Sequence, residues 1–337
     1  MKNQKVLENI HQLQYPERGQ NYVFNGYMKY LIECLGEKEE YDYYFFSFIS
    51  GDCVAQVFGQ NKDRWHPSLS QSRFDYDLIK RVFDSIGYSF AFVSPDELKA
   101  EPEKYKQMIM AYIDKGLPVI GKGFNNCWDN KAQMTDEVSC IVGYTDNGRT
   151  FFRLPEEATN LMPINLEDEY SYRLVFVGDK TAAPSLADVY KNTFFNIPNL
   201  LTLPPLNGVS FGIQAFIDWA NAVVSDFYDI AESEFDCWRV YTIYVCNLAT
   251  NLFSKQFIDR TFDLTPELAY IKPDFDEIYA DMEKTYVKLK EQGGEFNITY
   301  ETLQNKDKRK AIAETIAMFG HHFDNLYKLV LQEKNYG

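Results

Sequence analysis

Thiols and imidazoles are the side chains of this chain best suited to nucleophilic or metal chemistry, and they are few. No two cysteines have the two-residue spacing of a zinc or redox motif, and no paired histidine accompanies them. His321 and His322 are adjacent on a predicted helix, where neighbouring side chains point about 100° apart and cannot bind one metal together. We therefore expect no metal site, no cofactor and no disulfide framework. The cysteines are Cys34, Cys53, Cys127, Cys140, Cys237 and Cys246.

Two of these cysteines are candidates for a nucleophile. Cys127 lies beside Trp128 in a polar stretch, and Cys53 precedes a loop that carries Trp65 and His66. A thiol becomes reactive only where a neighbouring group lowers its pKa, and the sequence around Cys127 offers no histidine. We expect no catalytic residue, with a relocated nucleophile at Cys127 or Cys53 as the alternative.

Composition and net charge exclude several classes of function for this protein. The chain has 337 residues with a formal net charge of −15, which argues against nucleic acid and anionic membranes as partners. The N-terminal stretch lacks the apolar core of a signal peptide, and the longest apolar-leaning run, Val240 to Phe253, is too short to span a bilayer. These features predict a cytoplasmic protein. The 24 tyrosines and 26 phenylalanines predict a core and pockets rich in aromatic rings.

The stretch from Gly116 to Pro155 carries the clearest pattern of strands. Leu117 to Ile120 is a short apolar run bounded by glycines, and two further apolar runs span 138–144 and 150–154. Asn147-Gly148 between the last two tolerates the positive φ of a tight turn, which predicts an antiparallel hairpin. The polar segment Lys122 to Glu137 is expected to be a long loop, where sites are common.

The rest of the chain predicts an α+β fold followed by helices. A helix is expected over Asn21 to Leu35, capped by Asn21 or Asn25 and ended by Gly36. Thr181 to Pro184 marks the expected boundary between an α+β domain (1–180) with an antiparallel sheet and an all-helical domain (181–337). Helices are predicted beyond it over 186–192, 211–224, 235–257, 274–292 and 306–333.

The order of these elements resembles the papain-like cysteine peptidases. A helix ending in LIECLG comes first, and a second helix is followed by GLPVI, the expected loop, EVSCIVGYTDNG and FFRLP. The pattern is most similar to the bacterial branch shared by the double-glycine leader peptidases and the N-terminal domain of the butirosin biosynthesis protein H family. That second family also has a helical C-terminal half, and FGIQAFIDW resembles one of its helices. The likeness covers about residues 20–180.

The resemblance implies a catalytic cysteine at the start of the first helix, a histidine at the head of the strand before Gly143, and an orienting group before Pro155. The helix dipole would stabilise the thiolate and the histidine would activate it. The corresponding positions hold Tyr22, Val23 and Phe24, then Glu137, then Leu154. Three replacements predict a papain-like protein that has lost its catalytic groups.

We therefore expect a protein that binds a small-molecule or peptide-like ligand in the former active-site cleft. The Glu137 carboxylate there predicts a ligand with an amine or guanidinium group. Two alternatives stay open: an acyltransferase or amide hydrolase of the butirosin H type, and a helical docking protein that forms a homodimer. The residues expected to line the cleft are Tyr22, Phe24, Trp65, His66, Asn125, Cys127, Trp128 and Glu137.

Overall fold

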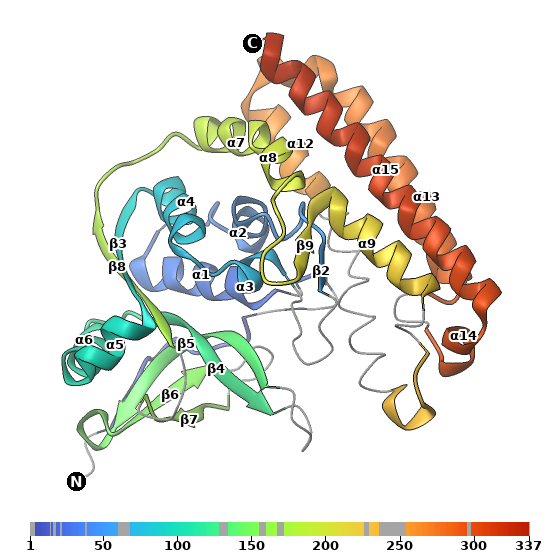
Figure 1. Ribbon diagram of the computed structural model, residues 1–337. Coiled ribbons are helices and arrows are strands. Elements are labelled where there is room, and N and C mark those ends of the chain that lie inside the picture. The colour runs from blue at the N-terminus through green and yellow to red at the C-terminus, as the bar shows by residue number, and fades with distance from the viewer. Residues whose placement is uncertain are drawn as a thin grey trace. The chain divides into compact units, whose positions relative to one another are not determined.

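Figure 1 shows the computed structural model, in which the chain forms two compact units. Unit 1 consists of Met1–Ser50 and Arg73–Pro184, and unit 2 consists of Gly51–Ser72 and Ser185–Gly337. The segment Gly51–Ser72 thus packs with the C-terminal half of the chain. The residues that the structure describes are 4–13, 15, 18–20, 22–37, 39–59, 68–127, 134–154, 160–166, 172–225, 229–235, 254–294 and 298–336.

Unit 1 is built on a seven-stranded sheet, as far as the described residues go. The strand order is β3-β8-β4-β5-β6-β7, with β1 added on β5, and each of these pairings is antiparallel. The expectation of a mixed helix-and-antiparallel-sheet fold is confirmed. The strands are β1 (Lys5–Val6), β3 (Tyr88–Val93), β4 (Val119–Cys127), β5 (Met134–Thr145), β6 (Thr150–Leu154), β7 (Met162–Ile164) and β8 (Arg173–Lys180).

The predicted hairpin is present, and its turn has the expected chemistry. β5 and β6 pair from Cys140 with Leu154 to Thr145 with Thr150. A short 3-10 turn, Asp146–Gly148, joins them, and Asn147 and Gly148 have φ values of 56° and 82°. Asparagine and glycine adopt such values at low steric cost, so the turn residues fix this register.

The expectation of a loop over Lys122 to Glu137 is wrong on both sides of 128–133, which lie outside the described residues. β4 continues to Cys127 and β5 begins at Met134, and the two strands pair along their length. A register shift between Lys122 and Phe124, at Gly123 with φ 114°, lets the ladder continue. Backbone groups hold a hairpin together, so a polar side-chain composition does not exclude it.

Five helices of six residues or more accompany the described sheet of unit 1. α1 packs against α2 and β5, whereas α6 packs against β1, β4 and β5. Gly36 ends α1 in the left-handed conformation (φ 68°), as expected. The predicted asparagine cap is wrong: α1 begins after Tyr22, and Asn25 lies inside the helix, where its Oδ1 accepts a hydrogen bond from Ser50 Oγ at 3.1 Å. The helices are α1 (Val23–Leu35), α2 (Tyr43–Ser50), α4 (Tyr76–Ile86), α5 (Pro95–Ala100) and α6 (Pro102–Asp114).

Unit 2 is mainly helical, and its core forms where α9 packs on α15. Phe216 and Phe323 stack there with ring centroids 5.2 Å apart. The predicted helix over 235–257 lies for the most part outside the described residues. The helices with their bounds are α3 (Leu69–Ser72), α7 (Leu186–Phe195), α8 (Ile197–Leu201), α9 (Gly212–Val224), α12 (Ser254–Leu264), α13 (Lys272–Glu291), α14 (Tyr300–Gln304) and α15 (Lys306–Tyr336).

The expectation of an all-helical C-terminal half is also wrong, at one place. β9 (Val209–Phe211) pairs antiparallel with β2 (Val57–Gly59), which comes from the first part of the sequence. The two strands are about 150 residues apart, so no local pattern in the sequence could show their pairing. Within the described residues, no helix is both long enough and apolar enough to cross a lipid bilayer.

Candidate functional site

The N-terminal end of α1 is where the papain-like resemblance implies a nucleophile, and Tyr22 stands there. Tyr22 is 6% exposed, and its backbone is held by Tyr43 from α2. The Tyr22 N–H donates to Tyr43 Oη at 2.8 Å, and the Tyr43 hydroxyl donates to the Tyr22 carbonyl at 3.1 Å. Its own side chain makes no cap of the helix. This helix terminus is therefore closed by packing and by Tyr43.

Phe24 is the second described residue of the predicted cleft, and it is part of the core. Its side chain is 0% exposed and meets Phe74 edge-on, with ring centroids 6.0 Å apart. One turn later, Tyr27 is also buried, and its hydroxyl donates to the Leu154 carbonyl at 2.9 Å. The first two turns of α1 thus tie it to α2 and to the end of β6.

The remaining predicted cleft residues are placed only in part. Asn125 and Cys127 lie on β4 and Glu137 lies on β5, with Glu137 paired to Phe124. Only the backbones of these residues belong to the described structure. Trp65, His66 and Trp128 lie outside the described residues. The grouping of these side chains around a cleft stays a prediction.

The three cysteines whose side chains the structure describes, Cys34, Cys53 and Cys140, are all at least half-buried. Cys53 is 3% exposed, and Cys140 is fully buried, which raises its pKa well above the usual value. Cys34 is half-buried near the end of α1. Burial raises the pKa of the Cys34 thiol to about 11, an effect that nearness to Tyr30 opposes and the Glu33 charge reinforces. All three are free thiols.

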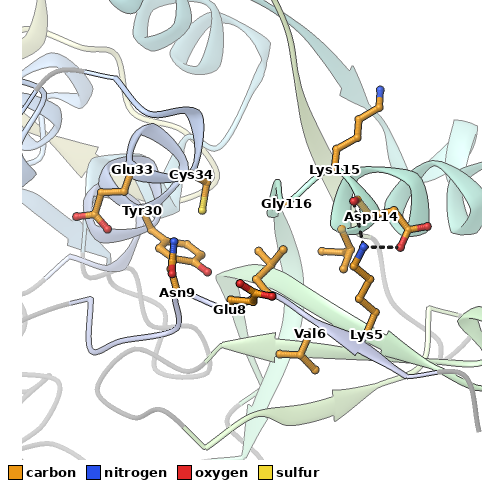
Figure 2. Close-up of a pocket in the computed structure, with 12 residues that line it drawn as sticks. Lys5, Val6, Glu8, Asn9, Tyr30, Glu33, Cys34, Asp114, Lys115 and Gly116 are labelled. Atoms are coloured by element: carbon orange, nitrogen blue, oxygen red, sulfur yellow. Dashed lines mark hydrogen bonds and ion pairs between the residues drawn. The ribbon is translucent and has the colours of Figure 1, made fainter.

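A pocket of about 440 Å³ lies at the C-terminal end of α1. Three segments far apart in the sequence meet there: residues 5–9, the last turns of α1, and the end of α6. Figure 2 shows the pocket with its lining side chains. The volume falls within the range of about 300–1,000 Å³ that small-molecule sites occupy. The lining residues are Lys5, Val6, Leu7, Glu8, Asn9, Tyr30, Glu33, Cys34, Ile113, Asp114, Lys115 and Gly116.

Tyr30 is the unusual member of this lining. Its side chain is 0% exposed, yet its hydroxyl makes no hydrogen bond of ordinary geometry; the Cys34 thiol is close enough to act on it but not placed as a proper partner. Burial, with the adjacent thiols of Cys34 and Cys140, raises the pKa of the Tyr30 phenol far above its ordinary value, so the group stays protonated. Tyr30 is not among the site residues predicted from the sequence. The available signal was that Tyr27, Tyr30 and Cys34 follow one another at helical spacing beside the apolar stripe.

Most charges around the pocket are paired. Lys5 Nζ lies 3.2 Å from Asp114 Oδ1 and donates to the Asp114 carbonyl at 3.0 Å. The Tyr144 hydroxyl also donates to Asp114 Oδ1, at 3.0 Å. Glu33 accepts from Lys29 at 2.6 Å and lies 2.7 Å from His11 Nε2. The pocket therefore has a buried polar group inside and mostly neutralised charges at its rim.

A scan against protein-family models finds no match for this chain, and a search of curated protein sequences finds none either.

Proposed function

We propose that this protein is a catalytically degenerate papain-like protein that binds a small-molecule or peptide-like ligand without forming a covalent bond to it. The observation that carries the proposal is the burial of Tyr22 and Phe24 at the start of α1. A papain-like site needs a thiol at this position, facing a histidine across the cleft. Two packed aromatic side chains leave no nucleophile there.

The position of the thiols supports the same proposal. A helix N-terminus stabilises a thiolate, whereas a C-terminus carries the opposite partial charge. Cys34 lies in the last turn of α1 and next to Glu33, and both features disfavour its ionised form. Burial also raises the pKa of the Cys140 thiol, which keeps that group protonated. A pocket lined by a thiol that stays protonated, that of Cys34, is suited to binding rather than to acyl transfer.

Thiol reactivity measured against pH tests the proposal. Each cysteine is followed by peptide mass spectrometry after brief treatment with iodoacetamide between pH 5 and 10. We expect no cysteine to alkylate with an apparent pKa below that of a free thiol, about 8.5. A fast reaction of Cys127 or Cys53 at neutral pH, abolished by its replacement with Ser, would favour the acyltransferase or hydrolase alternative.

A further inference from the structure

The pocket at the C-terminal end of α1 offers a specific combination of groups. We propose that it binds a small primary amine whose far end carries a hydroxyl or carbonyl group. The Tyr30 hydroxyl is the inner hydrogen-bond partner, and the Glu8 carboxylate is the counter-ion of the ammonium group. This inference rests on the proposed function in one respect, which is that unit 1 binds its ligand rather than transforming it.

The unpartnered hydroxyl of Tyr30 is the first step. A buried hydroxyl without a hydrogen bond is destabilising, and most buried polar groups in proteins have a partner. Tyr30 lines the pocket and is fully buried, and Figure 2 shows its ring between the N-terminal segment and Cys34. A phenol can both donate and accept, so a ligand hydroxyl or carbonyl can satisfy it.

The apolar part of the lining is the second step. Leu7 and Ile113 are buried residues of the pocket wall, at 7% and 0% exposure, and they come from different segments, the N-terminal stretch and α6. The Leu7 N–H donates to the Val142 carbonyl at 2.9 Å, so this backbone donor is not available to a ligand. Leu7 therefore contributes its apolar side chain to the wall. A short aliphatic or aromatic body fits between such groups.

The charge at the mouth is the third step. Glu8 is exposed and has no ion pair with any other described residue, and in the view of Figure 2 it lies between Tyr30 and Lys5. Lys5 is occupied by Asp114, and Lys115 extends away from Tyr30. Lys115 Nζ lies 5.7 Å from the centroid of the Tyr112 ring. Glu8 is thus the carboxylate of the described lining that is left to a ligand.

The two helix ends reinforce this preference. α1 ends at Leu35 and α6 ends at Asp114, and residues of both last turns line the pocket. A helix C-terminus carries a partial negative charge and favours a cation nearby. Two such ends together with Glu8 select an ammonium group over a carboxylate at the mouth.

A matched set of probes tests the assignment. We would titrate the full chain with 6-aminohexan-1-ol, hexan-1-ol and 6-hydroxyhexanoate, and measure affinity by calorimetry and by saturation-transfer NMR. The amino alcohol should bind at least about tenfold more tightly than the neutral alcohol, since a partly desolvated ion pair adds roughly one such factor. The carboxylate should bind most weakly. Bound amino alcohol should also slow alkylation of Cys34 at pH 9.

Two variants connect the affinity to the proposed groups. Tyr30→Phe should weaken the amino alcohol about threefold to tenfold, the usual range for one neutral hydrogen bond. Glu8→Gln should weaken the amino alcohol by a similar factor and leave hexan-1-ol unchanged. Glu103→Gln, which removes an exposed carboxylate on α6 outside the pocket, is the control and should change neither affinity. Thermal unfolding checks that Tyr30→Phe folds, since loss of an unpartnered hydroxyl should not lower its stability.

The outcomes separate failure of this site from failure of the proposed function. Equal binding of the three probes, or no binding of any at millimolar concentration, would overturn the amine assignment. Binding that neither protects Cys34 nor responds to Tyr30→Phe would place the ligand elsewhere, overturning this site while leaving a binding function intact. Covalent transfer to or from a probe by a low-pKa cysteine would overturn the proposed function itself.

Discussion

Buried tyrosines lie near both ends of α1, but they differ in whether their hydroxyl groups have hydrogen-bond partners. At the N-terminal end, the hydroxyls of Tyr27 and of Tyr43 from α2 both have backbone partners, and Phe24 is fully buried. At the C-terminal end, Tyr30 is just as buried, but its hydroxyl is unpartnered and a pocket opens beside it. Burial alone therefore does not distinguish core from site. Whether the buried polar atom has a hydrogen-bond partner does distinguish them, because a buried polar group without a partner lowers the stability of the fold.

Removing the Phe24 ring should have the largest effect on this comparison. Phe24→Ala leaves a cavity in a closely packed region, and we expect a loss of about 3–5 kcal/mol in the free energy of unfolding. Urea denaturation followed by circular dichroism, with hydrogen exchange of unit 1 amides, measures it. Tyr76→Ala removes a ring that is 54% exposed and should cost much less. If the two variants lose equal stability, the N-terminal end of α1 is not the packed region described above.

Removing the Tyr27 hydroxyl should have a smaller effect that sharpens the contrast. Tyr27→Phe deletes the hydrogen bond to Leu154 O, although Ser139 Oγ remains at 3.4 Å from that carbonyl. We expect a loss of about 1 kcal/mol by thermal or urea unfolding. The same deletion at Tyr30 should cost nothing. A larger loss for Tyr30→Phe than for Tyr27→Phe would contradict the difference between the two ends.

The smallest effect concerns Glu33, which lies at the C-terminal end of α1. Partial burial favours a higher pKa for its carboxyl group, but the hydrogen bonds from Lys29 and His11 outweigh it and lower the pKa below the ordinary value. The ionised form is thus favoured by folding, so this stabilisation is present above the unfolded pKa and is lost as the pH falls through the folded pKa. Because the side chain is 38% exposed, Glu33→Gln should cost only about 0.2–1 kcal/mol at pH 7.

The measurement compares the urea midpoints of Glu33→Gln and the parent chain from pH 7 downwards. The difference should shrink in acid as the parent carboxyl becomes protonated, and it should also shrink in 1 M salt. A difference that grows on acidification would mean that burial, rather than the two partners, dominates the pKa of Glu33.

Local chemistry made part of the fold predictable. The Asp146–Gly148 turn and the end of α1 at Gly36 both follow from residues that tolerate positive φ, and each feature depends on a few neighbouring positions. The loop predicted for the polar run after Lys122 is wrong because its structure depends on distant partners rather than on neighbouring residues. Its strands are held by backbone bonds between β4 and β5, which side-chain composition does not report.

The sequence by itself determined the α+β composition, the hairpin, the acidic net charge and the absence of cysteine and histidine at the expected catalytic positions. Only the tertiary structure decided where a pocket forms, because Leu7, Tyr30 and Ile113 come together from segments that are distant along the chain. It also decided that the Tyr27 hydroxyl has a partner and the Tyr30 hydroxyl has none. Both are tyrosines one turn apart on the same helix, and a hydrogen bond depends on which distant atom arrives within reach.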